Sequence, residues 1–135
     1  MLPQRINLIA YSTLAVIICY IDRVNISVAI IPMQEQFGWS DSQVGFIFSS
    51  FYLGYMLTMA LGGYLSDKFG GKRVLGWGVV LWSIFTILTP LAAHNGFFAL
   101  FFIRVLMGIG EGVTFPAWHS LYARWIPFNE RTRAI

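Results

Sequence analysis

GGYLSDKFGGKRVL, residues 62–75, is a short charged segment between two long, uncharged and apolar segments. Its basic residues are Lys68, Lys72 and Arg73. Lys and Arg are retained on the cytoplasmic side of short membrane loops, so they place this segment inside the cell. We therefore predict a cytoplasmic loop at 62–75 that separates two pairs of membrane-spanning helices, with the N-terminus on the same side.

The composition indicates an integral membrane protein. Of the 135 residues, 57% are hydrophobic and only 11% are charged, and the mean hydropathy is +0.67. A membrane-spanning helix needs about 20 mostly apolar residues, so four of them leave room only for turns and ends. We predict an all-α fold. Its spans are expected at 6–31, 44–64, 74–93 and 97–125.

The sequence gives no support for nucleic-acid binding, metal binding or enzymatic catalysis. The net charge of +3 comes from basic residues beside the spans, which topology already explains, so nucleic acid is not an expected partner. A single cysteine, Cys19, forms no internal disulfide and no metal-ligand pattern. The serines are scattered and the two histidines are distant in sequence, so no catalytic constellation is visible and we predict no enzyme.

Two adjacent ionisable residues, Asp22 and Arg23, lie inside the first predicted span. A helix over 6–31 is roughly 39 Å long, and this pair lies about 6 Å from its midpoint. Ionisable groups at that depth are costly and mark functional sites by default. Helical spacing places Arg23 on one stripe with Tyr20 and places Asp22 nearer Asn25. The alternative is that both charges reach the outer interface or lock this helix to a neighbour.

The fourth predicted span contains RVLMGIGEGVTFP, from Arg104 to Pro116. Arg104 and Glu111 are seven residues apart, so they share one helical face at a separation of roughly 10 Å along the axis. Gly110 and Gly112 would let a neighbouring helix approach closely. Pro116 would bend the helix or free a backbone carbonyl.

The charged segment carries a specific pattern, Gly63-x-Leu65-x-Asp67-x-x-Gly70-x-Lys72-Arg73. It resembles the signature between the second and third helices of the major facilitator superfamily of transporters. By this resemblance the segment is a conformational latch formed by Gly63, Asp67, Gly70, Lys72 and Arg73. Such a latch biases the carrier between outward-open and inward-open states. The alternative is a charged turn that only fixes topology.

Further motifs narrow the resemblance, which covers essentially the whole chain. Arg104-x-x-x-Gly108-x-Gly110 looks like the superfamily's fourth-helix motif. Asp22-Arg23-x-Asn25, together with Gly-x-Gly-Glu111-Gly-x-x-Phe115-Pro116, is similar to its anion:cation symporter family. That family includes sugar-acid, sialic acid, vesicular glutamate and plastid-type phosphate carriers. Trp125-x-Pro127-x-x-Glu130-Arg131-x-Arg133 looks like the turn before the fifth helix.

The resemblance implies roles for particular residues. Arg23 would grip an anionic substrate at two points, as guanidinium groups grip carboxylate or phosphate. The implied substrate-binding residues are Arg23, Arg104, Tyr20 and Asn25. Asp22 and Glu111 are the implied ion-coupling residues, with H⁺ or Na⁺ as the coupling ion and no other cofactor. Arg104 is either the ion partner of Glu111 or a structural anchor between helices.

Symmetry supports the same two helices. The halves of such transporters contain inverted three-helix repeats, so the first and fourth helices should occupy corresponding positions beside a central cavity. In this sequence Asp22, Arg23, Arg104 and Glu111 lie on those two predicted spans, whereas the second and third spans carry no charge.

The resemblance implies four helices of an N-terminal six-helix bundle whose remaining partner is the rest of the transporter. We expect proton- or sodium-coupled symport of small organic anions by alternating access, across the cell (inner or plasma) membrane. Alternatives are an inorganic phosphate carrier of the same family and a non-transporting four-helix membrane module. Alone, this segment is not expected to transport. If it were complete, it would have to oligomerise to enclose its charges.

Overall fold

The structure is a computed structural model that describes residues 2–130 and 132. Its helical elements are α1 (Leu2–Phe37), α2 (Asp41–Phe69), α3 (Gly71–Asn95), α4 (Phe97–Gly112), α5 (Thr114–Trp125) and the short 3₁₀ helix η1 (Phe128–Glu130). Four stretches of the described residues are long and apolar enough to cross a membrane, and the fourth runs from α4 through α5. The all-α membrane fold is therefore confirmed.

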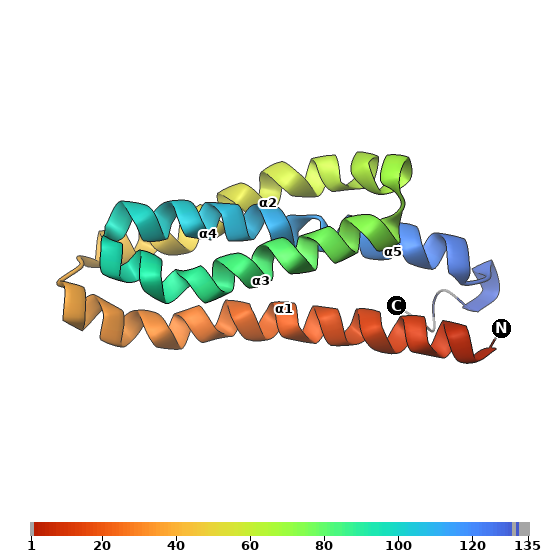
Figure 1. Cartoon of the computed structure of the whole chain (residues 1–135), viewed down its shortest axis with the longest axis horizontal. Helices are drawn as coiled ribbons and strands as arrows, with labels where there is room; N and C mark the ends of the chain where they lie inside the picture. Colours follow the sequence, from red (N-terminus) through yellow and green to blue (C-terminus); the bar gives the residue numbers. More distant parts are fainter. Residues whose placement is uncertain (1, 131, 133–135) are drawn as a thin grey trace.

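Successive spans run in opposite directions (Figure 1). The start of α1, the α2–α3 turn and the end of α5 lie at one end of the bundle, and the α1–α2 and α3–α4 turns lie at the other. The first end carries the basic residues Arg5, Lys68, Lys72, Arg73 and Arg124. This is the segregation of Lys and Arg expected of a membrane bundle. Arg131 and Arg133 lie outside the described residues.

The segment 62–75 is helical almost throughout, so the predicted loop is wrong in its extent. Only Gly70 separates α2 from α3, and its φ of 89° permits the tight reversal. A Cβ on the next residue, Gly71, would lie 2.6 Å from the carbonyl oxygen of Ala117, so α3 packs closely on α5 here. Charge marks where a chain leaves the hydrocarbon, whereas the helical hydrogen bonds continue beyond that boundary.

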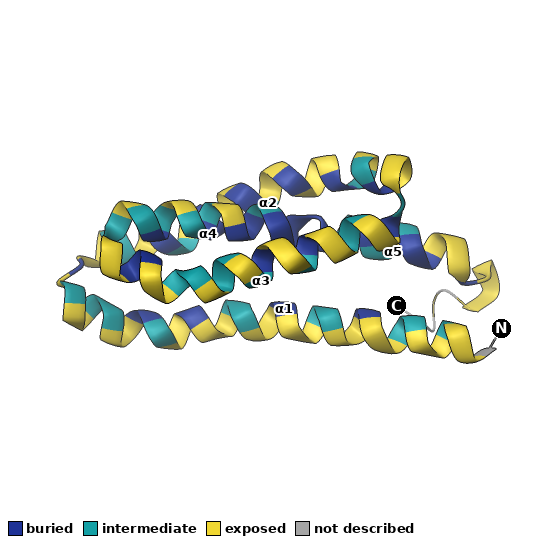
Figure 2. Cartoon of the chain, viewed as in Figure 1, coloured by how far each residue is buried: buried dark blue, intermediate teal, exposed yellow. Residues whose placement is uncertain are grey.

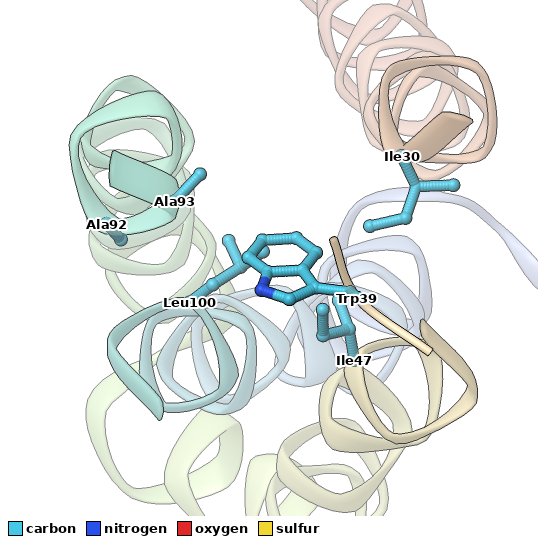
Figure 3. Packing of buried hydrophobic residues seen from close by; sticks show 6 residues of the cluster. All are labelled: Ile30, Trp39, Ile47, Ala92, Ala93 and Leu100. Carbon is cyan, nitrogen blue, oxygen red and sulfur yellow. The ribbon is translucent and has the colours of Figure 1, made fainter. Parts of the chain in front are cut away.

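At the opposite end, the α1–α2 turn packs into a buried apolar cluster. Ser40 caps α2 by accepting a hydrogen bond from the N–H of Gln43, as expected for an N-cap. The preceding residue, Trp39, belongs to a buried apolar cluster that draws on α1, α2, α3 and α4. Figure 3 shows its indole lying among the other cluster residues, Ile30, Ile47, Ala92, Ala93 and Leu100.

The fourth span is interrupted at Val113, between α4 and α5. The cause is Pro116, which lacks the N–H that would otherwise bond to the carbonyl of Gly112. The ladder resumes at once, because the N–H of Ala117 donates to the carbonyl of Val113 at 3.0 Å. The predicted effect of Pro116 is confirmed.

Glycines bring α2 and α4 into backbone contact. A Cβ on Gly54 would collide with the carbonyl of Val105, and a Cβ on Gly108 with that of Phe51. One turn beyond Gly108, a Cβ on Gly112 would lie 2.7 Å from the carbonyl of Tyr55. This is the small-residue packing that replaces the hydrophobic effect between helices in a bilayer.

In contrast, α1 is held at a few separate points (Figure 2). Its buried positions, Ser12, Cys19, Ile26 and Ile30, recur at intervals of seven or four and form one narrow stripe. Near the basic end, the hydroxyls of Ser12 and Tyr122 are hydrogen-bonded at 2.7 Å inside the protein. Most other side chains of α1 are exposed.

We predict that Gly108→Ala lowers the free energy of unfolding by about 1–3 kcal/mol, because the new methyl group forces α4 away from α2. Gly76→Ala in α3 is the matched control, because nothing lies within 4 Å of a Cβ there. It should be neutral or slightly stabilising. Thermal unfolding of the purified protein in detergent measures both, and equal effects would contradict the proposed close contact.

Candidate functional site

The site is built around one buried ion pair between α1 and α4. Arg23 Nε donates to Glu111 Oε1 at 3.2 Å. The side chain of Glu111 is 1% exposed and that of Arg23 is 19% exposed. Both lie near the middle of their spans, where an uncompensated charge is most costly. The structure thus brings together two of the residues predicted from the sequence.

Arg104 contacts Phe51 and Met107 rather than Glu111, the partner that its spacing along the helix allows. It lies 3% exposed on α4, with its guanidinium carbon 5.0 Å from the centre of the Phe51 ring. Its Nη1 donates to the sulfur of Met107 at 3.2 Å. Of the two predicted roles, ion partner of Glu111 or anchor between helices, the contacts favour the anchor. A shared helical face does not bring two side chains within reach when they are two turns apart.

Asp22 on α1 lies within electrostatic reach of Arg104 on α4, but the two form no ion pair within the described residues. The one ion pair of the described cluster joins the base of α1 to the acid of α4, and Arg104 is also influenced by the charge of Glu111 on its own helix. The four formal charges cancel. Asp22 is half-buried.

Aromatic rings enclose the guanidinium of Arg23. Its central carbon lies 4.7 Å from the centre of the Tyr55 ring and 5.4 Å from those of Tyr20 and Phe51. Such contacts stabilise a cation that has left water. Tyr20 was predicted on the stripe of Arg23, whereas Phe51 and Tyr55 are additions from α2. Asn25 is exposed and forms no side-chain hydrogen bond with a described residue.

Cys19 is the site residue that the sequence did not reveal. Its thiol donates a hydrogen bond to Oε1 of Glu111, the oxygen that also accepts from Arg23. Cys19 is buried on the inner stripe of α1, one turn before Arg23. That spacing of four residues was the available signal, because residues so spaced share a helical face.

Several atoms of this cluster have hydrogen-bonding capacity left over. Arg23 Nη2, Arg104 Nε and Glu111 Oε2 are buried and have no hydrogen-bond partner among the described residues. Buried polar groups in proteins are normally satisfied, and exceptions require an explanation. Two cationic donors and one acidic acceptor could serve an anion and a coupling cation. The described residues hold no group of three metal ligands.

The predicted latch residues occupy the turn between α2 and α3. Asp67, Lys72 and Arg73 are exposed, and Asp67 forms no ion pair within residues 2–130. A Cβ on Gly63 would have no neighbour within 4 Å, so that glycine is not required by packing in this conformation. Their role as a latch remains a prediction.

A family model described as the Major Facilitator Superfamily matches residues 12–135. The chain belongs to the Major Facilitator Superfamily. This confirms the superfamily indicated by the pattern at 62–75.

Three similar proteins bear names of transporters. Probable anion transporter 4, chloroplastic, of Oryza sativa subsp. japonica is 50% identical over 133 residues, which are 98% of this chain and 22% of the relative. Ascorbate transporter, chloroplastic, of Arabidopsis thaliana is 49% identical, over 98% of this chain and 25% of the relative. Sodium-dependent phosphate transport protein 1, chloroplastic, of the same plant is 47% identical, over 98% and 26%.

These relatives correct one prediction and set a limit on the others. The prediction of the cell or plasma membrane is wrong, because all three are chloroplastic proteins. Basic residues determine which side of a membrane a turn occupies, but they do not identify the membrane. The chain spans about a quarter of the length of these relatives.

We predict that Arg23→Met lowers the stability of the protein by about 3 kcal/mol, because Glu111 keeps a buried charge without its cation. Adding Glu111→Gln removes that charge and should restore most of the loss. Thermal unfolding in detergent compares the variants. Arg124→Met, at an exposed position, is the control. A double variant no more stable than Arg23→Met would show that the pair is not coupled.

Proposed function

We propose that this chain is part of a secondary carrier that moves small anions across a plastid membrane by alternating access. Transport is coupled to H⁺ or Na⁺. The observation that carries the proposal is the Arg23 guanidinium, held near mid-membrane by Glu111 and three aromatic rings, with Nη2 buried and unpartnered among the described residues. A guanidinium with a free edge suits a carboxylate or phosphate group.

Coupling follows from competition for Arg23. An arriving anion that binds the guanidinium weakens its bond to Glu111, leaving a carboxylate in a poorly solvated place. Binding a proton or Na⁺ relieves that cost. Asp22, which lies within electrostatic reach of Arg104, is the second proposed ion-coupling residue. Anion and coupling ion therefore favour one another's binding, as symport requires.

The proposed substrate class is small organic anions, with inorganic phosphate as the alternative. The rings of Tyr20, Phe51 and Tyr55 give Arg23 an apolar wall, which suits a carbon skeleton better than a phosphate ion. Among the relatives, one is named for ascorbate and one for phosphate. Competition between organic acids and phosphate in one uptake assay decides between these classes.

In a plastid envelope membrane, the basic end of the bundle would face the stroma. The chloroplastic relatives support the organelle, and the clustering of Lys68, Lys72 and Arg73 supports the orientation. Cysteine labelling from the two sides of intact plastids, at positions introduced in the two ends of the bundle, tests this assignment.

We predict that Arg23→Ala in the full-length carrier lowers anion uptake by roughly 10- to 100-fold, because the charge-assisted hydrogen bonds to the substrate are lost. Glu111→Gln should remove the dependence of uptake on the coupling-ion gradient. Reconstituted liposomes with imposed proton or sodium gradients provide the measurement. Arg124→Gln is the matched arginine control. Unchanged uptake in Arg23→Ala would refute the assigned role of Arg23, whereas no uptake by the unaltered protein would favour a non-transporting module.

We predict that Asp67→Asn changes the balance between outward-open and inward-open states, because the latch loses its one negative charge while Lys72 and Arg73 keep theirs. The measurement is the accessibility of an introduced outer-end cysteine to a membrane-impermeant thiol reagent. Asp41→Asn, at the outer start of α2, is the control for loss of a surface carboxylate. Equal accessibility in the unaltered protein and Asp67→Asn would leave only the topological role.

A further inference from the structure

The second contact of Glu111 with α1 carries an inference that rests on the proposed function and deepens it. We propose that Cys19 is a positioning residue for ion coupling. Its thiol holds the Glu111 carboxylate in place while Arg23 engages the substrate anion.

The geometry makes the two contacts interchangeable. Cys19 and Arg23 lie one turn apart on the face of α1 that meets α4, and both donate to Oε1 of Glu111. If the guanidinium turns toward an anion, one donor to that oxygen remains. The carboxylate therefore need not swing away from its position when its cation is drawn off.

The chemistry of a thiol suits this task. A thiol is a small, weak and uncharged donor, so it orients a carboxylate without neutralising it. A second cation at this position would keep Glu111 permanently compensated and would reduce the effect of the substrate on ion binding. Once Arg23 turns toward the anion, an apolar side chain would leave the buried carboxylate without a donor, at the cost of an unsatisfied polar group.

One carboxylate oxygen of Glu111 remains available for the coupling ion. Its Oε2 is buried without a hydrogen-bond partner in the described chain, so the Cys19 contact occupies one oxygen and leaves the other available. The charged groups facing it are Arg23 and Asp22 on α1 and Arg104 on its own helix. On α2, the titratable Tyr55 contacts Arg23, and the charged residues of α3 lie near its ends.

The first test separates ion coupling from anion binding. In the full-length carrier reconstituted in liposomes, Cys19→Ala should change the apparent affinity for the coupling ion by about two- to five-fold, because one weak hydrogen bond is lost. With the coupling ion at saturating concentration, the KM for the anion should stay within the error of the measurement. Cys19→Ser keeps a donor and should restore the coupling-ion affinity. A structural defect would instead lower uptake without this selectivity.

The second test detects the contact without transport. The S–H stretching band of Cys19 is isolated as the infrared difference between the unaltered protein and Cys19→Ser. We expect that band to move toward the position of a weaker hydrogen bond in Glu111→Gln, because an amide oxygen is a poorer acceptor than a carboxylate. Asp41→Asn should leave the band in place.

The outcomes distinguish this inference from the function beneath it. An unaltered carrier that takes up no anion under either gradient refutes the proposed function. Normal uptake with identical coupling-ion affinity in Cys19→Ala refutes the role of Cys19 while the function stands. An S–H band that ignores Glu111→Gln also refutes the contact, whatever the transport result.

Discussion

The bond between Arg23 and Glu111 is the constraint to which the rest of the bundle is fitted. Either charge alone near the middle of a bilayer would cost several kcal/mol, so α1 and α4 must meet at this level. At this level, α2 contributes aromatic side chains that can contact the cation. Phe51 and Tyr55 supply ring faces, which tolerate a cation and exclude lipid. A membrane-embedded charge thus determines the chemistry of three helices.

Close packing elsewhere allows this polar centre to exist. Gly54 and Gly108 let α2 and α4 touch through their backbones. Glu111 lies on α4, between Gly108 and Gly112, and is buried. If α2 and α4 packed less closely, the Glu111 carboxylate could move together with Arg23. Anion binding would then have less effect on ion binding.

The helix α1 contacts the rest of the described bundle at three levels. It is attached by the hydrogen bond between Ser12 and Tyr122 near one end and by the ion pair with Glu111 at the middle. At the other end, Ile30 belongs to the buried apolar cluster. Most of its remaining surface is exposed in the described structure. A small number of separate contacts can change one at a time, whereas a continuous interface must be broken as a whole. Among the described helices, α1 is attached more sparsely than α2 is to α4.

The sequence by itself determined the class of protein, the spans and most of the charged site. Long apolar runs must cross a bilayer as helices, and an ionisable residue within such a run stands out by its cost, which identified Asp22, Arg23 and Glu111. Only the tertiary structure decided which charge meets which. Spacing along one helix left Arg104 as a possible partner of Glu111, but the distance between α1 and α4 gave that place to Arg23 and added Cys19. Local periodicity shows which face a residue occupies, whereas the identity of its neighbour depends on how separate helices pack.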